Sequence, residues 1–328
     1  MKRILVCFGT RPEYIKVKSL IDNLPNVKTC NTGQHTGLLQ NIPSDYQLSI
    51  ESTTSCRLNN IVIGILSHIE VFQDIEYVLV QGDTTSAIAM ALSAIHNGKR
   101  VIHLEAGLRT FDCSDPFPEE LNRQMISRIA SIHLCPTHLN RQNLMNEGIR
   151  DNLFVVGNTG LDSIDPSGCT YGNTVFITLH RRKNVESIED WFLELNSLSL
   201  SYPSISFVIA VHPNPAIRKH THLLKNIQVV EPMPHDVTIN IVKSCMCIIS
   251  DSGGLQEEAS FLKKKIIICR ESTERPEILG TFGTLCSHPS ELRSKFEIVL
   301  RDPMIELECP YGDGRSYQRI INVFNEIL

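Results

Sequence analysis

Short apolar runs alternate with longer amphipathic stretches along most of the 328-residue chain. The runs ILVCF, YVLVQ and CIIS have the length and composition of buried strands. The stretches between such runs carry apolar residues at the three- and four-residue spacing of helices that cover a sheet. This alternation predicts parallel sheets with crossover helices.

The strands and helices expected from this pattern form two similar sets. In the first half we expect strands near 3–8, 27–32, 76–81, 100–104, 131–135 and 153–157, and helices over 12–23, 57–71, 84–97, 119–130 and 137–147. In the second half we expect strands near 174–179, 205–211, 227–230, 245–250 and 265–269, and helices over 187–199, 235–243, 254–262 and 290–300. The predicted fold class is therefore α/β, with two doubly wound Rossmann-like domains that face a cleft.

A polar segment, DPSGCTYGN at 165–173, contains two glycines and a proline and is predicted to be a linker. We therefore expect an N-terminal domain over 1–166 and a C-terminal domain over 167–310. The tail at 311–328 has apolar residues at helical spacing, and we expect its helix to pack back on the N-terminal domain. Ligands of such domains bind at the carboxyl ends of the strands and in the cleft between domains.

Composition narrows the class of protein. The chain is 42% apolar and 20% charged, with a net charge of −5, which argues against a nucleic-acid-binding surface. The sequence contains no apolar run of 18 residues, so we expect no membrane-spanning helix. The short apolar stretch at the N-terminus is interpreted as a first strand. The eleven cysteines are scattered without a CxxC pair, which is typical of reduced thiols in the cytoplasm. No His, Cys or Asp set has metal-ligand spacing, so we expect no metal.

The turn GTRPE, residues 9–13, joins the first strand to the first helix. Arg11 takes the place where Ser, Thr or Asp would ordinarily cap a helix that begins at Pro12. A cation there opposes the helix dipole, and a bound phosphate or carboxylate would remove the conflict.

Acidic residues follow several predicted strands or start the next helix. Asp83, Glu105 and Glu119 come from three segments of the first domain, where converging acids could act as general acid and base. Spacing alone favours turn capping or surface salt bridges for each acid. His180 and His212 follow two strands of the second half and are equally consistent with a structural role and with phosphate binding or proton transfer.

The turn DSGGLQEE, residues 251–258, places Ser252, Gly253 and Gly254 between a strand and a helix. Such a turn could hold a diphosphate on its backbone N–H groups, although a plain turn has the same residues. Glu258 could accept hydrogen bonds from ribose hydroxyls or simply complement the helix dipole. Arg275 is either part of a salt-bridged loop or points into the cleft. Neither GxGxxG after the first strand nor GxxxxGK[ST] is present, so we expect no nicotinamide or flavin cofactor and no P-loop.

These motifs together resemble a known family. GTRPE, TGQH, GDTTS, HLEAGLRT, PFPEELNR, GNTGLD, HRR, HPNP, DSGGLQEE and STERPE run in the same order as in the non-hydrolysing UDP-N-acetylglucosamine 2-epimerases. The resemblance implies the glycosyltransferase-B architecture, usually as a homodimer. It also implies inversion at C2 of UDP-N-acetylglucosamine or a close relative, through elimination of UDP to a glycal and re-addition, without a cofactor.

The resemblance assigns roles to individual residues. Acid–base work falls to Asp83, Glu105 and Glu119, and His180 is implied to lie near the diphosphate with a catalytic role. The substrate-binding residues it implies are Arg11, Lys16, Arg123, His212, Ser252, Gly253, Gly254, Glu258 and Arg275. The chain departs from the family pattern at His235, where an aromatic residue is common near the uracil.

Three alternatives remain open at this point. A hydrolysing 2-epimerase would release the free sugar and UDP. A glycosyltransferase of the same architecture would need an acceptor. A nucleotide-sugar-binding protein without catalysis would leave the C2 hydrogen in place.

Overall fold

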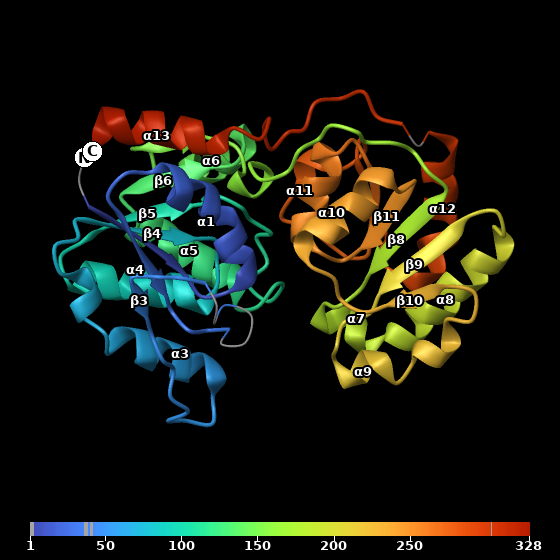
Figure 1. The fold of residues 1–328 in the computed structure, drawn as a ribbon, viewed down its shortest axis with the longest axis horizontal. Helices are drawn as coiled ribbons and strands as arrows, with labels where there is room; N and C mark the ends of the chain where they lie inside the picture. The colour runs from blue at the N-terminus through green and yellow to red at the C-terminus, as the bar shows by residue number, and fades with distance from the viewer. Residues whose placement is uncertain (1–2, 36–38, 40–41, 303) are drawn as a thin grey trace. The chain divides into compact units, whose positions relative to one another are not determined.

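The computed structural model describes residues 3–35, 39, 42–302 and 304–328. The chain divides into two compact units (Figure 1): unit 1 comprises Met1–Ser163 and Tyr311–Leu328, and unit 2 comprises Ile164–Pro310. Among the described helices, none has both the length and the hydropathy needed to cross a bilayer.

Unit 1 is built on a seven-stranded parallel sheet in the order β3-β2-β1-β4-β5-β6-β7. The strand order reverses between β1 and β4, which is the switch point where doubly wound sheets bind ligands. The strands are β1 (Ile4–Phe8), β2 (Val27–Asn31), β3 (Tyr46–Gln47), β4 (Tyr77–Gln81), β5 (Arg100–Leu104), β6 (Ile132–Cys135) and β7 (Leu153–Val155).

Helices cover both faces of this sheet (Figure 1). They are α1 (Arg11–Asn23), α3 (Arg57–Leu66), α4 (Thr85–His96), α5 (Glu119–Ile129), α6 (His138–Asn146) and α13 (Ser316–Ile327), with 3₁₀ turns η1 (Glu70–Phe72) and η2 (Thr159–Leu161). Successive residues of β1 point to opposite faces. Leu5 and Cys7 therefore enter the cluster beneath α3, α4 and α5, whereas Ile4 and Val6 enter the cluster beneath α1 and α13.

Unit 2 repeats the plan with a six-stranded parallel sheet in the order β10-β9-β8-β11-β12-β13. Its strands are β8 (Thr174–Thr178), β9 (Ser206–Ala210), β10 (Gln228–Val230), β11 (Cys247–Ser250), β12 (Lys265–Ile268) and β13 (Gly283–Leu285). Its helices are α7 (Arg182–Glu186), α8 (Ile188–Ser201), α9 (Pro215–Arg218), α10 (His235–Ser244), α11 (Gly253–Phe261) and α12 (Leu292–Arg301), with η3 (Thr221–Leu223), η4 (Pro276–Ile278) and η5 (Pro289–Glu291).

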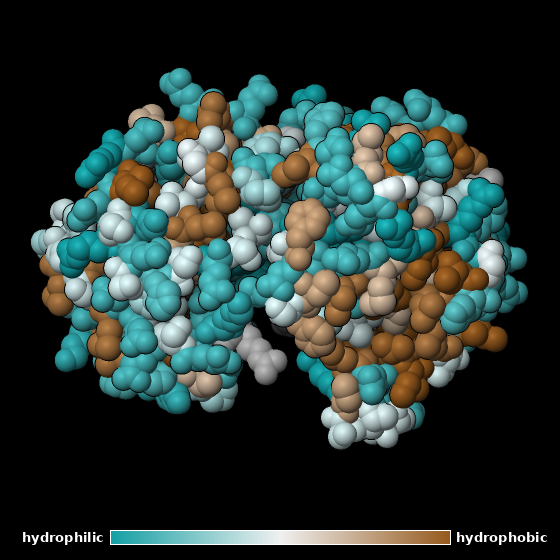
Figure 2. All heavy atoms as spheres, turned by 180° about the vertical axis from the view of Figure 1, so that it is seen from behind, coloured by the Kyte–Doolittle hydropathy of each residue, from teal (hydrophilic) through white to brown (hydrophobic). Residues whose placement is uncertain are grey.

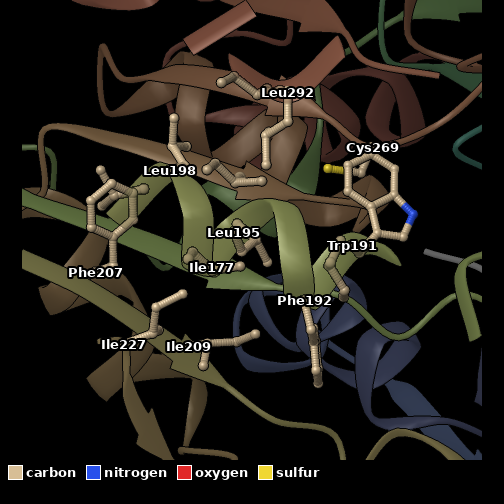
Figure 3. Close-up of a cluster of buried hydrophobic side chains, with 14 of the residues drawn as sticks. Ile177, Trp191, Phe192, Leu195, Leu198, Phe207, Ile209, Ile227, Cys269 and Leu292 are labelled. Atoms are coloured by element: carbon tan, nitrogen blue, oxygen red, sulfur yellow. The ribbon is translucent and has the colours of Figure 1, made fainter. Parts of the chain in front are cut away.

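The core of unit 2 is formed where α8 packs on the sheet. Figure 3 shows Trp191, Phe192 and Leu195 of α8 close to strand and neighbouring-helix residues such as Ile177 and Leu292. These side chains are at most 2% exposed, so they anchor α8 across the sheet by apolar burial.

The α/β class and the two doubly wound sheets are confirmed, while two details differ from the prediction. The helix expected over 57–71 ends at Leu66, because Val71 and Phe72 reach the core from the separate turn η1. The strands β3 and β13, only two and three residues long, were not predicted because such short pairings leave no periodic pattern.

The interpretation of Arg11 as a misplaced cap was wrong. Helix α1 begins at Arg11, and Thr10 is its N-cap. The Thr10 hydroxyl accepts from the Glu13 backbone N–H, and the Glu13 carboxylate accepts from the Thr10 N–H, so the two form a capping box. Arg11 therefore occupies the first helical position, and its cation still lies at the positive end of the dipole.

Candidate active site

In unit 1 the turns after β1 and β4 are fastened to each other by one buried carboxylate. Glu13 Oε2 accepts from the N–H groups of Gly9 (3.0 Å) and Thr10 (2.7 Å), and Glu13 Oε1 accepts from the Thr84 hydroxyl (2.7 Å). Burial raises the pKa of Glu13, although these hydrogen bonds oppose the rise. The contacts hold the GTR and GDT turns side by side at the switch point.

Glu105 lies at the next strand end, after β5. Its Oε1 is paired with Lys16 Nζ of α1, and its Oε2 accepts from Gln81 Nε2 at the end of β4. The side chain is 11% exposed, and the backbone φ of 69° is left-handed, which is uncommon for a non-glycine residue. Because each carboxylate oxygen has its own donor, the carboxylate of Glu105 is fixed in orientation.

Asp83 follows Gly82 in the turn after β4. Arg123 Nη2 of α5 lies 2.8 Å from Asp83 Oδ2, and the Asn122 side chain donates to the Asp83 carbonyl over 2.8 Å. Asp83 is 31% exposed at its side chain, whereas Arg123 is 3% exposed. A Cβ added to Gly82 would lie 3.3 Å from Glu105 Oε2, so Asp83 and Glu105 occupy adjoining turns.

Two adjacent acids begin α5 and differ in environment. Glu120 is fully buried and accepts from the N–H groups of Thr110 and Phe111, so it anchors the loop before α5. Glu119 is half-buried and lies one turn before Arg123, the residue that contacts Asp83. The structure thus brings Glu119 to the helix that contacts the Asp83 turn, and Glu120 has a structural role.

Arg11 is half-buried at the start of α1. Within the described part of the chain, no carboxylate forms an ion pair with its guanidinium, in contrast to Lys16 and Arg123. A cation at a helix N-terminus without a carboxylate partner is suited to bind an anion.

In unit 2, two histidines follow neighbouring strands. His180 comes after β8 and His212 after β9, and their rings stack with centroids 6.0 Å apart and an interplanar angle of 21°. His180 Nδ1 lies 3.1 Å from Asp251 Oδ1, at the end of β11. Burial lowers the pKa of His180, while the charge of Asp251 raises it and Arg181, His212 and Arg270 lower it further.

The turn after Asp251 starts helix α11. Ser252 is its N-cap, and among the described residues its hydroxyl makes no capping hydrogen bond to the helix. A Cβ on Gly253 would lie 2.8 Å from Arg275 Nη1, whereas a Cβ on Gly254 would meet no described atom within 4 Å. The first N–H groups of α11 therefore remain available to an anion, as helix N-termini generally are.

Arg275 is part of a buried charge network behind this turn. Its Nε lies 2.7 Å from Glu257 Oε1, and its Nη1 is paired with Glu274. Arg270 joins the same network, with Nη1 2.7 Å from Glu274 and Nε donating to the Asp251 carbonyl over 2.8 Å. Burial lowers the pKa of Arg270 to about 10. In the structure, Arg275 is thus salt-bridged and supports Gly253 from behind.

Glu258 lies on the same helix and has a different partner. Its Oε1 lies 2.7 Å from His235 Nε2, the first residue of α10, and both side chains are mostly buried. Among the described residues, no group of three or more His, Cys, Asp or Glu side chains is arranged to hold a metal ion.

A model of the family described as UDP-N-acetylglucosamine 2-epimerase matches residues 22–325. This chain belongs to the UDP-N-acetylglucosamine 2-epimerase family. The chain is 34% identical to the UDP-N-acetylglucosamine 2-epimerase of Campylobacter jejuni, over 98% of this chain and 97% of that protein. It is 33% identical to the enzyme of that name from Bacillus subtilis strain 168, over 97% of this chain and 94% of that protein.

Solved structures of the epimerase family share the fold. The structure of the Neisseria meningitidis UDP-GlcNAc 2-epimerase bound to UDP-GlcNAc has a TM-score of 0.90 with 32% identity, covering 99% of this chain and all of that one. The Methanocaldococcus jannaschii enzyme in complex with UDP-GlcNAc and UDP has a TM-score of 0.80 with 28% identity, covering 99% of this chain and all of that one.

Three polar residues of this epimerase-family chain lie in the candidate site but were not predicted: Gln81, Asp251 and Arg270. Gln81 ends β4, Asp251 directly follows β11, and Arg270 lies two residues beyond the end of β12, so their positions near strand ends were visible in the sequence. What the sequence did not show was their partners, which come from segments 24 to 71 residues away for Gln81 and Asp251.

Proposed function

We propose that this chain catalyses the non-hydrolysing C2 epimerisation of a UDP-sugar, UDP-GlcNAc to UDP-N-acetylmannosamine or a close relative. The observation that supports it best is the pair of carboxylates in adjoining turns of unit 1. Asp83 and Glu105 each have a cationic partner, Arg123 and Lys16, which fixes the position of the carboxylate. Epimerisation needs such a set, because a proton leaves one face of C2 and returns on the other.

The reaction we propose has two halves. A carboxylate of unit 1 takes the C2 proton, the C2–H electron pair becomes the second bond of a C1=C2 glycal, and the C1–O bond breaks with its electrons on UDP. In the second half, UDP adds back to C1 and an acid of unit 1 delivers a proton to the opposite face of C2. Asp83, Glu105 and Glu119 are the acids we assign to these transfers. A C2 proton is weakly acidic, so precise placement of the base contributes much of the rate.

Departing UDP gains negative charge on its diphosphate, and the polar groups at strand ends are suited to stabilise it. Arg11, His180 and His212 supply side chains for this purpose. The turn Ser252–Gly254 supplies uncapped N–H groups and the dipole of α11. We further assign Glu258 to the ribose hydroxyls, with His235 holding its carboxylate, and Arg275 to the support of the turn.

NMR of a panel of UDP-sugars in D₂O tests the proposal. Deuterium incorporation at C2, with UDP-N-acetylmannosamine and no free sugar, is the expected result. Free N-acetylmannosamine with UDP would instead identify a hydrolysing enzyme. Turnover only with an added acceptor would indicate a glycosyltransferase. Binding of UDP with no exchange at C2 would leave a binding protein without catalysis.

We also propose that the chain forms a homodimer through one face of unit 1. Helices α3, α4 and α5 lie side by side, and Figure 2 shows apolar side chains gathered over this part of unit 1, on the right of the view. The exposed apolar residues of these helices and the segments beside them are Leu58, Ile63, Ile69, Ile95, Phe111, Phe117, Leu121 and Met125. Exposed apolar side chains gathered on one face are typical of a protein interface.

A further inference from the structure

The two stacked histidines of unit 2 have different partners at the same ring atom. His180 Nδ1 faces the carboxylate of Asp251 at 3.1 Å. His212 Nδ1 instead accepts a hydrogen bond from the Asn214 backbone N–H at 3.2 Å. A carboxylate oxygen repels a ring-nitrogen lone pair, whereas a backbone N–H needs one as its acceptor, so the two surroundings favour opposite protonation of Nδ1.

Asp251 is held so that it can only accept. It is fully buried, and its oxygens accept from the N–H groups of His180 (3.1 and 2.9 Å) and Arg181 (2.8 Å) and from the Asn184 side chain (2.9 Å). All of these partners are donors, so both carboxylate oxygens act as acceptors. At 3.1 Å from this acceptor, a proton on His180 Nδ1 is electrostatically favoured over a lone pair.

We propose that Asp251 is a positioning residue of the active site, which fixes the proton of neutral His180 on Nδ1 and leaves Nε2 to face the ligand. In His212 the backbone of Asn214 fixes the opposite tautomer, with the proton on Nε2. The stacked pair thus presents one nitrogen that can take up a proton and one N–H that can donate. This proposal rests on the proposed function only for the nature of the ligand, a UDP-sugar diphosphate.

The surroundings of His180 make the tautomer matter. Burial lowers the pKa of His180, so the neutral ring is favoured before a ligand binds. The charged and titratable groups around it are Asp251, Arg181, His212 and Arg270. A diphosphate beside Nε2 would favour protonation there, and the resulting imidazolium would lie between two anions, Asp251 and the ligand. With the proton on the other nitrogen, the lone pair would face Asp251 and repel it.

Long-range ¹H–¹⁵N NMR of the histidine rings tests the proposal without any substrate. Signals are assigned with the variants His180→Gln and His212→Gln. We expect the Nδ1–H tautomer for His180 and the Nε2–H tautomer for His212 in the wild-type protein at neutral pH. A wild-type His180 found as the Nε2–H tautomer would overturn the proposal, whether or not any Asp251 variant folds.

The variant Asp251→Asn adds a functional readout. It should shift His180 to the Nε2–H tautomer and lower kcat for epimerisation by about 10- to 100-fold, with KM changed by less than about 3-fold. The matched control is Asn184→Ala, which removes another partner of Asp251 without touching the His180 ring. It should keep the His180 tautomer and a kcat within about 3-fold of wild type.

The outcomes separate this inference from the proposed function. If Asp251→Asn and Asn184→Ala lower kcat equally with no tautomer change, Asp251 is only a loop anchor and the proposal is wrong. If wild-type His180 has the expected tautomer but no UDP-sugar exchanges at C2, the positioning by Asp251 stands and the proposed reaction is wrong.

Discussion

Arg123 Nη2 lies 2.8 Å from Asp83 Oδ2, so helix α5 holds the acid in the turn after β4. Arg123 is 3% exposed and Asp83 is 31% exposed, which leaves the carboxylate accessible while its cation is buried. This arrangement orients a reactive group through a rigid helix, as efficient proton transfer requires.

Replacing Asp83 should therefore affect catalysis much more than folding. We expect Asp83→Asn to lower kcat by about 10²- to 10⁴-fold, because the amide cannot carry a proton. The rate of C2 deuterium exchange measured by NMR is the readout. Asp74→Asn is the matched control, since Asp74 lies in the exposed turn before β4 and should keep wild-type activity. Equal rates for the two variants would remove Asp83 from the proton-transfer set.

The ion pair between Lys16 and Glu105 should contribute more to the free energy of unfolding than a surface ion pair does. Lys16 is 14% and Glu105 11% exposed, so Lys16→Met leaves a mostly buried carboxylate without its cation. We expect a loss of about 3–5 kcal/mol in the free energy of unfolding, measured in urea. The double variant Lys16→Met/Glu105→Gln should recover part of this loss, because the unpaired charge is gone.

An exposed ion pair on the same helix provides the comparison. Lys18 and Asp22 are 49% and 51% exposed, and Lys18→Met should change the free energy of unfolding by less than about 1 kcal/mol. If Lys16→Met costs no more than Lys18→Met, Lys16 does not stabilise the Glu105 carboxylate as we infer.

Substitution by alanine should have different effects at the two neighbouring glycines of the α11 turn, Gly253 and Gly254. Gly253→Ala would place Cβ 2.8 Å from Arg275 Nη1, so we expect a loss of about 1–3 kcal/mol in stability. Gly254→Ala meets no described atom within 4 Å, so its stability should be within about 1 kcal/mol of wild type or higher. Thermal unfolding measures both.

The affinity for UDP tests whether the α11 turn binds the diphosphate. Because the space beside Gly254 is open, a diphosphate on the turn would occupy it, and Gly254→Ala should weaken UDP binding by calorimetry while remaining folded. Unchanged UDP affinity in Gly254→Ala would argue against the turn as the diphosphate site.

The pH dependence of stability should report a buried histidine of β5. Burial lowers the pKa of His103 from 6.5 to about 3, while its ring contacts the Gly82 carbonyl. The unfolded chain therefore binds a proton that the folded chain does not between pH 6.5 and pH 3. Above this window the neutral His103 costs the folded state nothing. As the pH decreases through the window, the free energy of unfolding should fall by about 1.4 kcal/mol per pH unit.

Unfolding of wild type and His103→Gln at pH 7.5 and pH 5 checks this expectation. The variant should lose less stability between the two pH values than wild type does, although burial also lowers the pKa of His133 and leaves a residual slope. An identical loss in both proteins would contradict the assignment to His103.

The apolar face of unit 1 predicts self-association. Ile63→Glu combined with Met125→Glu should shift the protein from dimer to monomer in analytical ultracentrifugation, because buried charge disfavours the contact. Leu193→Glu is the control, since Leu193 is equally exposed but lies on α8 of unit 2. A monomeric wild type, or a dimer unaffected by the double substitution, would exclude this face as the interface.

The sequence by itself determined the layered architecture and the residues that could be reactive. Apolar runs of strand length and amphipathic stretches of helix length are local patterns, and they correctly predicted two parallel sheets with crossover helices. The same local view showed that Asp83, Glu105, His180 and the Ser252–Gly254 turn follow strands. The local pattern did not predict the start of α1 correctly. Arg11 was placed at the cap position, whereas Thr10 is the N-cap and forms a capping box with Glu13.

Only the tertiary structure decided which of these residues act together. The strand order places β1, β4 and β5 side by side, so Lys16 of α1 meets Glu105 from 89 positions away. It also places β8 beside β11, so His180 meets Asp251 from 71 positions away. It also showed that Glu120 is buried as a loop anchor while the adjacent Glu119 is half-buried. The physical reason is that periodicity reports which face of an element is buried, whereas the pairing of charges depends on distances set by the packing of remote segments.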